Sequence, residues 1–223
     1  MLNVGWFSTG RDEAARQLLQ AVRARINAGH INGKISFVSG NREPTQTKES
    51  DLFFALPRSY NIPLICLSRK SLKTVRKEEW RTEYDQEVNV RIAPLACDIC
   101  LLAGYMLIVS QVPSQEHDMT SLHPAPPGGP LGSWQAVMWA LIDTKPDTAG
   151  AIMHLVTPES DRGPVVSYCL FSIKGETFAQ YWQKGDTNAL LRLIRRHELA
   201  REFSLITLTL QSLSRGEISI RGG

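Results

Sequence analysis

The sequence has little net charge, few cysteines and no long run of apolar residues. It carries 25 lysines and arginines against 22 acidic residues, which gives a formal net charge of +3. This excess is too small to indicate a nucleic-acid-binding surface by itself. No apolar run approaches the roughly 18 residues of a membrane-spanning helix, and the first residues lack the apolar stretch of a signal peptide. We therefore expect no membrane span, no signal peptide and a cytoplasmic location.

The four cysteines are Cys66, Cys97, Cys100 and Cys169, and all lie in apolar, strand-like runs. Cys97 and Cys100 form a Cys-x-x-Cys motif, but the motif opens a predicted strand rather than a helix. No second pair completes a zinc site. We therefore favour buried thiols in a reducing compartment over zinc binding or redox chemistry, and we expect no metal site.

The composition is that of a globular domain with a sizeable core. Hydrophobic residues make up 43% and charged residues 21% of the 223 positions, and these values are ordinary for globular proteins. The length suits one large domain or two small ones. Because no repeat or long linker divides the chain, we predict a single domain over 1–223.

Apolar runs and helical periodicity alternate along the first half of the chain. Short apolar runs are typical of buried strands, and apolar residues spaced three and four apart are typical of amphipathic helices. The alternation predicts an α/β, Rossmann-like fold with a mostly parallel central sheet and helices on both faces. The patterns place strands at 2–8, 33–40, 62–68 and 98–109, and helices at 12–29, 50–61 and 80–95.

The second half of the chain is less regular. The stretch 119–129, MTSLHPAPPGG, reads as a loop whose three prolines and two glycines set the backbone. His123 in this loop is either a surface residue or a group held at a site, since imidazole exchanges protons near neutral pH. The remaining patterns place helices at 131–143 and 187–214, and strands at 149–157, 163–173 and 216–221.

The turn FSTGRDEAAR, residues 7–16, is a candidate anion site. Gly10 permits a tight turn, and free N–H groups at a helix N-terminus attract anions. Asp12 and Glu13 would repel a phosphate, although they also suit the helix dipole. An ordinary strand–helix turn is therefore an equal alternative.

The segment HLVTPESDRGPVV, residues 154–166, places Glu159 and Asp161 in a turn between two apolar strands. The two acids form either a solvated loop or a carboxylate site that orients or charges a histidine. A parallel sheet could bring Asp161 to His123, because sites form at the carboxyl ends of adjacent strands.

Three segments, in order, resemble the folate-dependent formyltransferases. LLAGYM (101–106), SLHPAPPGG (121–129) and AGAIMHLVTPESDRGPVV (149–166) are similar to that family's Ala-Gly-aromatic-Met strand, Asn-x-His-Pro loop, and His-x-Val strand with an Asp-x-Gly-Pro turn. WRTEYDQEV (80–88) and RRHELAREF (195–203) resemble the branch that acts on glycinamide ribonucleotide, whereas QAVMWALID also echoes the methionyl-tRNA branch. The resemblance spans nearly the whole chain and implies the formyltransferase fold.

The resemblance implies a catalytic set. His123 falls on the family's catalytic histidine, Asp161 on its catalytic aspartate, and Ser121 where the family has its catalytic asparagine. In the family, the asparagine amide donates to the developing oxyanion, the histidine manages protons, and the aspartate orients or charges the histidine. These roles meet the physical needs of acyl transfer.

The resemblance also implies binding residues and two functional halves of the one domain. A nucleotide- or phosphate-binding half would span 1–110, and a catalytic and folate-binding half would span 111–223. Folate would contact Met106, Leu107, Ile108, Val109 and Glu159. The amine substrate would contact Gly10, Arg11, Arg81 and Glu198.

The implied reaction is formyl transfer from the co-substrate 10-formyltetrahydrofolate to a primary amine, with glycinamide ribonucleotide in purine biosynthesis as the first choice. Ser121 departs from the family pattern, because a hydroxyl is shorter than an amide and donates one hydrogen bond. Three alternatives therefore stay open: another amine such as an amino sugar or amino acid, hydrolysis of the formyl-folate, and folate or nucleotide binding without turnover. We expect small-molecule partners only, no membrane or nucleic-acid partner, and a monomer or homodimer.

Overall fold

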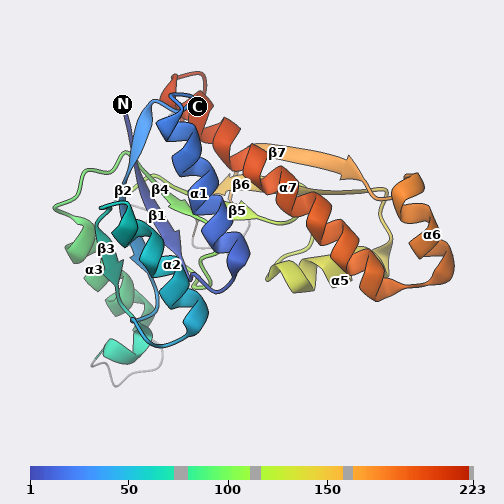
Figure 1. The fold of residues 1–223 in the computed structure, drawn as a ribbon, viewed down its shortest axis with the longest axis horizontal. Coiled ribbons are helices and arrows are strands. Elements are labelled where there is room, and N and C mark those ends of the chain that lie inside the picture. The colour runs from blue at the N-terminus through green and yellow to red at the C-terminus, as the bar shows by residue number, and fades with distance from the viewer. Residues whose placement is uncertain (73–79, 111–116, 158–162, 221–223) are drawn as a thin grey trace.

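A seven-stranded sheet organises the chain (Figure 1). The computed structural model describes residues 1–72, 80–110, 117–157 and 163–220. Across the sheet the strands follow the order β3-β2-β1-β4-β5-β6-β7. Their bounds are β1 Leu2–Ser8, β2 Gly33–Gly40, β3 Leu64–Cys66, β4 Ile99–Leu102, β5 Met119–His123, β6 Thr148–Leu155 and β7 Val165–Ser172.

Strand β6 runs opposite to the other six strands of the sheet. The pairs β3–β2, β2–β1, β1–β4 and β4–β5 are parallel. The pairs β5–β6 and β6–β7 are antiparallel. The prediction of a mostly parallel sheet is therefore confirmed, and the antiparallel pairing sets Ser121 of β5 opposite His154 of β6.

Helices cover both faces of the sheet, as predicted. In Figure 1, α1, α2 and α7 lie in front of the sheet, and α3 lies behind it. No helix in the described part of the chain is both long and apolar enough to span a membrane. The helices are α1 Glu13–Asn27, α2 Lys48–Ser59, α3 Trp80–Ile92, α5 Trp134–Thr144, α6 Glu176–Lys184 and α7 Thr187–Ser214, with a short 3₁₀ turn at Arg69–Ser71.

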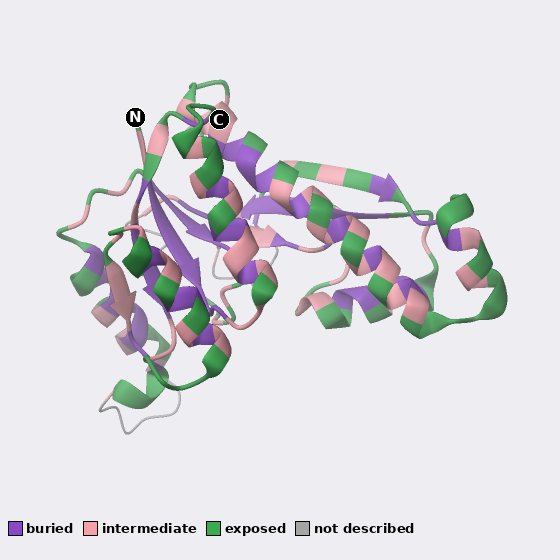
Figure 2. Cartoon of the chain, viewed as in Figure 1, coloured by how far each residue is buried: buried purple, intermediate pink, exposed green. Residues whose placement is uncertain are grey.

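Neighbouring residues of β1 face opposite layers of the core, because successive strand side chains alternate between the faces of a sheet. Trp6 belongs to the cluster that includes Leu19 of α1 and Ile206 of α7. Phe7 belongs to the cluster on the α3 side, with Tyr84. Figure 2 shows the central strands buried and the edge strand β7 partly exposed.

A third cluster supports the half of the sheet that carries β6 and β7. It joins Met138 and Leu141 of α5 to Phe171 of β7 and Ile194 of α7. The long helix α7 begins at an N-cap, where the Asp186 carboxylate accepts from the Ala189 N–H at 3.0 Å. The helix predicted at 187–214 is thereby confirmed, with the same bounds.

One strand prediction and one loop prediction around the cavity described below were wrong in part. The strand predicted at 98–109 ends at Leu102, because Gly104 takes a left-handed φ of +68° that breaks the ladder. Residues 119–123, predicted as part of a loop, form β5. This strand pairs with β4 on one side and β6 on the other, so its polar residues sit inside the sheet.

Two further differences lie near the C-terminus. The short helix α6 was not predicted, because its nine residues begin directly after Gly175 and give a brief pattern. The strand predicted at 216–221 does not form over 216–220, and Arg221 lies outside the described residues. Gly216 instead takes a φ of +70°, and the Glu217 N–H donates back to the Ser212 carbonyl, which terminates α7.

Candidate active site

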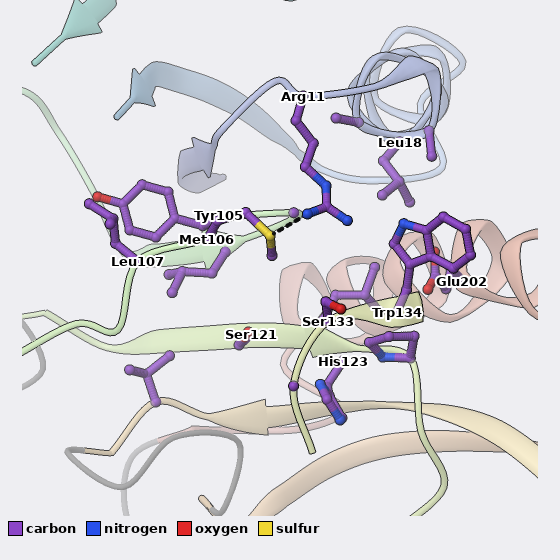
Figure 3. A pocket seen from close by; sticks show the side chains of 18 of the residues that line it. Arg11, Leu18, Tyr105, Met106, Leu107, Ser121, His123, Ser133, Trp134 and Glu202 are labelled. Carbon is purple, nitrogen blue, oxygen red and sulfur yellow. Dashed lines mark hydrogen bonds between the residues drawn. The ribbon is translucent and has the colours of Figure 1, made fainter. Parts of the chain in front are cut away.

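A cavity of about 410 Å³ lies at the carboxyl ends of β1, β4 and β5 (Figure 3). The first turns of α1 and α5, one face of α7 and the loop after β4 complete its walls. Open α/β sheets bind their ligands in crevices at this edge. Its polar lining includes Arg11, Ser121, His123, His154, Arg195 and Glu202.

The loop Gly104–Val109, which we call the pocket loop, forms the apolar wall. Met106 and Ile108 expose 45% and 43% of their surface although both are apolar. The loop is tied to β1, because the Thr9 N–H donates to the Gly104 carbonyl at 3.0 Å and the Met106 N–H donates to Thr9 Oγ1 at 2.9 Å. An apolar wall beside a few fixed polar groups is typical of small-molecule sites.

Helix α3 holds the pocket loop near its start, at Tyr105, and just after its end, at Ser110. The Asp85 carboxylate accepts a hydrogen bond from the Ser110 N–H at 2.6 Å, and the Tyr105 hydroxyl donates to the Tyr84 hydroxyl at 3.5 Å. Burial raises the pKa of Asp85, and the hydrogen bond from Ser110 opposes this rise. The tyrosine and aspartate of the WRTEYDQEV segment therefore position the loop without lining the cavity.

The turn after β1 directs Arg11 into the cavity. Gly10 has a φ of +60°, and a Cβ there would lie 2.8 Å from Phe53, so glycine is required. The Arg11 guanidinium donates to Met106 Sδ through Nη1 and to Gln135 Oε1 through Nη2, both at 3.0 Å. Arg11 therefore spans the cavity from the pocket loop to α5, and Figure 3 shows the contact with Met106.

Asp12 acts as the N-cap of α1. Its Oδ1 accepts from the Ala15 N–H at 3.0 Å, and its Oδ2 lies 3.6 Å from Arg11 Nε. The carboxylate thus occupies the helix end at which a phosphate would bind, as in an ordinary capped turn. The positive charge offered to the cavity by this turn comes from the Arg11 side chain.

Ser121 and His123 stand two residues apart on β5, and both line the cavity. His123 is only 4% exposed. Its Nε2 donates to the carbonyl oxygen of Pro130 at 2.9 Å. Because a carbonyl only accepts, Nε2 carries a proton, and in the neutral ring Nδ1 is the basic nitrogen. The proline-rich segment thus holds the imidazole at the cavity.

A second buried histidine, His154 of β6, faces the first. The ring centroids of His123 and His154 are 6.4 Å apart, with an interplanar angle of 81°. His154 Nδ1 donates to the Leu155 carbonyl at 2.9 Å. The antiparallel pairing of β5 and β6 thus sets two imidazoles at the same wall of the cavity.

Helix α7 contributes a buried charged cluster of Arg195, Glu198 and Glu202. Arg195 Nη1 donates to Glu198 Oε2 and to Glu202 Oε1, both at 2.9 Å. Burial, together with the charge of Glu202, raises the pKa of Glu198 to about 9 against the opposing charge of Arg195. Glu198 therefore keeps its proton at neutral pH, and Arg195 with Glu202 forms the face that lines the cavity.

The model of the formyl transferase family matches residues 13–188. The chain belongs to this family. The phosphoribosylglycinamide formyltransferase of Saccharomyces cerevisiae is 31% identical over an alignment 140 residues long, which covers 56% of this chain and 65% of that protein. The alignment thus spans slightly less than two thirds of the yeast relative.

Solved structures share the fold of this chain. Glycinamide ribonucleotide transformylase 1 from Symbiobacterium toebii has a TM-score of 0.78 and 20% identity, and covers 100% of this chain and 92% of its own. Phosphoribosylglycinamide formyltransferase from Brucella melitensis has a TM-score of 0.74 and 19% identity over 98% of both chains. At these identities the likeness establishes the fold, and function is argued from the site.

The structure brings together part of the predicted catalytic set. Ser121 and His123 share the cavity, whereas Asp161 and the predicted folate contact Glu159 lie outside the described residues. The predicted folate segment Met106–Val109 lines the cavity as a loop rather than as a strand. Among the described residues, no three His, Cys, Asp or Glu side chains are grouped to hold a metal ion.

The four predicted amine-substrate residues are dispersed. Arg11 enters the cavity, and Gly10 shapes the turn that places it there. Arg81 is exposed at the start of α3, with its guanidinium 5.6 Å from the Trp80 ring centroid, and does not line the cavity. Glu198 has no exposed surface and also does not line it.

Sequence reasoning did not assign His154, Arg195 or Glu202 to the site. His154 lies in the quoted His-x-Val segment. Alternation along a strand assigns its side chain to one face of the sheet, but the pairing with Ser121 of β5 is known only from the structure. Glu202 follows Glu198 by four residues, so both lie on one face of α7. Packing then decides which carboxylate reaches the cavity.

Proposed function

We propose that this chain transfers a formyl group from 10-formyltetrahydrofolate to a primary amine, with glycinamide ribonucleotide as the first candidate acceptor. The observation that carries the proposal is the placement of Ser121 and His123 beside an apolar pocket loop, in a member of the formyl transferase family. The names of the yeast relative and of the solved structures support this choice of acceptor.

In the proposed reaction, the amine nitrogen attacks the formyl carbon and an oxyanion develops on the formyl oxygen. His123 takes the proton of the attacking amine, since imidazole exchanges protons near neutral pH. The same proton then passes to the folate nitrogen as the carbon–nitrogen bond breaks. Asp161 remains our proposal for the carboxylate that orients or charges the imidazole.

Ser121 is the proposed hydroxyl donor to the oxyanion. A donor aimed at the position where charge develops lowers the barrier more than one aimed at the substrate. The hydroxyl is shorter than the asparagine amide of the family, so a bridging water would complete its reach. The serine at this position also supports a second candidate function, hydrolysis of the formyl-folate. The reason is that a water molecule is already part of the proposed contact.

For binding, we propose that folate lies along Met106–Val109, with Glu159 beside it, and that an anionic part of the amine substrate meets Arg11. The cavity lining supports Arg11 over the exposed Arg81 as the anion contact. The cavity lining also supports Glu202, rather than the fully buried Glu198, as the acid that contacts the amine of the substrate. The two halves of the domain would then share the site: residues 1–110 would supply the anion contact and the folate segment, and residues 111–223 the catalytic groups, Glu159 and Glu202.

We further propose a cytoplasmic enzyme that works on small molecules as a monomer or homodimer. The four cysteines are free thiols, which suits a reducing compartment. The weak net charge of +3 supports small-molecule rather than nucleic-acid partners.

The test is the release of tetrahydrofolate from 10-formyltetrahydrofolate, measured with and without glycinamide ribonucleotide. Release that requires the ribonucleotide, together with formylation of its amine, supports the proposal. Release in its absence indicates the hydrolase. If the protein binds folate but releases no tetrahydrofolate under either condition, both the transferase acting on this ribonucleotide and the hydrolase are wrong. The chain would then be a binding protein or would act on another amine.

The matched variant is His123→Ala, with exposed His30→Ala as its control. We expect His123→Ala to lower turnover by at least about 100-fold, in the range of general acid–base contributions, while tetrahydrofolate binding is kept. His30→Ala should behave as the wild type. Turnover that survives in His123→Ala would remove the histidine from the mechanism.

A further inference from the structure

Two cysteine sulfurs meet at the amino end of β4. Cys97 Sγ and Cys100 Sγ are 3.4 Å apart, although Cys97 precedes the strand and Cys100 lies within it. The cavity lies at the carboxyl end of the same strand, so this pair is remote from the proposed chemistry. The Cys-x-x-Cys segment therefore brings its thiols into contact although it opens a strand and not a helix.

The two thiols differ in accessibility and acidity. Cys97 is half-buried, whereas Cys100 is fully buried among the residues on the α3 side of the sheet. The hydrogen bond from Cys100 lowers the pKa of Cys97, and the same contact together with burial raises the pKa of Cys100. This asymmetry is that of an attacking thiolate and a protected resolving thiol.

The other two cysteines provide an internal comparison. Cys66 lies on β3 and Cys169 on β7, the two opposite edges of the sheet. Burial raises the pKa of the Cys66 thiol to about 11 and also raises the pKa of Cys169. Both are half-buried like Cys97, so access alone does not distinguish Cys97 from them.

We propose that Cys97 and Cys100 form a dithiol site that exchanges with small-molecule disulfides such as oxidised glutathione. The Cys97 thiolate attacks one sulfur of the disulfide, forms a mixed disulfide and releases one reduced glutathione. The Cys100 thiol loses its proton and attacks Cys97 Sγ, which forms the intramolecular disulfide and releases the second glutathione. Two protein thiols are oxidised and one glutathione disulfide is reduced.

The motion needed is small and local. The sulfurs must approach by about 1.4 Å to reach the bond length of a disulfide. Cys100 shares its buried cluster with Leu102 and Met119, so the approach draws one side chain from that cluster towards the half-buried Cys97. The exchange needs neither folate nor amine, and its test is therefore independent of the proposed function.

The experiment incubates the full chain with mixtures of reduced and oxidised glutathione, blocks free thiols by alkylation, and measures intact and peptide masses. We expect loss of two hydrogens from the protein and a peptide cross-link between Cys97 and Cys100. Cys66 and Cys169 should be alkylated in full. No loss of hydrogens at any ratio, or glutathione on Cys66 or Cys169 before Cys97, would overturn the proposal.

Single variants separate the two roles. Cys100→Ser should stop the reaction at the first step and retain one glutathione on Cys97, whereas Cys97→Ser should take up none. Cys66→Ser and Cys169→Ser should form the cross-link as the wild type does. Because Cys100 is in the core, Cys100→Ala serves as a second test of the same step, with circular dichroism to confirm its fold. A folded Cys100→Ser variant, which keeps an O–H donor beside Cys97, that takes up no glutathione would show that Cys97 is not the attacking thiol.

Discussion

At the scale of single residues, Ser121 places a hydroxyl where the resemblance to formyltransferases implies an asparagine. Ser121→Asn restores an amide at the same cavity wall, and we expect a higher rate of formyl transfer. One oxyanion donor is worth roughly 100- to 1000-fold in rate, so the gain should be a sizeable part of that range. The measurement is the turnover number at saturating 10-formyltetrahydrofolate and amine.

Ser121→Ala is the matched control, because it removes the hydroxyl without adding a donor. We expect it to be slower than the wild type if the hydroxyl, directly or through water, meets the oxyanion. Should Ser121→Asn turn over no faster than the wild type, the missing-donor explanation is wrong. Equal rates for Ser121→Ala and wild type would remove Ser121 from the mechanism.

At the scale of elements, α3 positions the pocket loop through the hydrogen bond that Asp85 accepts from the Ser110 N–H. Asp85→Asn keeps the shape but replaces a buried carboxylate that accepts from the Ser110 N–H at 2.6 Å. A hydrogen bond to a charged group contributes about 1.5–3 kcal/mol. We therefore expect tetrahydrofolate to bind about tenfold more weakly or worse, measured by titration of intrinsic fluorescence.

Glu87→Gln, on the same helix, is the control for Asp85→Asn. The Glu87 carboxylate accepts from Arg91 at 2.8 Å and does not line the cavity, so its loss should leave tetrahydrofolate binding unchanged. Equal affinities for Asp85→Asn and wild type would show that α3 does not position the loop.

At the scale of the whole molecule, Glu198 makes stability depend on pH. Burial raises its pKa from 4.5 to about 9, so between these values the native state binds a proton that the unfolded chain does not. The free energy of unfolding therefore falls as pH rises through this window, by at most about 1.4 kcal/mol per pH unit. Glu198→Gln mimics the protonated acid and should remove this contribution, as measured by urea unfolding across the window.

The control is Glu176→Gln, which changes an exposed acid in the first turn of α6. It should leave the slope of stability against pH as in the wild type. Glu198→Gln should equal the wild type near the acid end of the window and exceed its stability near the alkaline end. A slope that persists in Glu198→Gln would mean that another group carries the pH dependence.

Much of the fold could be predicted because apolar residues recur along the sequence at the spacing of helices and in the short runs of buried strands. The stripe of leucine, isoleucine and phenylalanine over 187–214 defined α7 to its ends, and apolar runs located β1 and β2. The same rule failed after Leu102. The residues of the pocket loop are apolar because they line a cavity, yet the same residue types would fill a buried strand.

The site could be predicted only in part, for a related reason. A motif located His123 and Ser121, but no pattern in the sequence says that Pro130 accepts from the imidazole. Helical spacing puts Glu198 and Glu202 on one face of α7, and only packing against the sheet decides that Glu202 meets the cavity. Asp161 lies outside the described residues, so its place in the site stays a prediction.

The hydrogen bond from His123 to Pro130 has a consequence for the energetics of proton transfer. A backbone carbonyl accepts from Nε2 of a neutral imidazole and of an imidazolium alike, so this bond persists when Nδ1 gains a proton. The stiff proline-rich segment thus fixes an axis for the imidazole in both of its protonation states. The proton transfer that we propose for His123 would therefore need no rotation of the ring and little reorganisation of its surroundings.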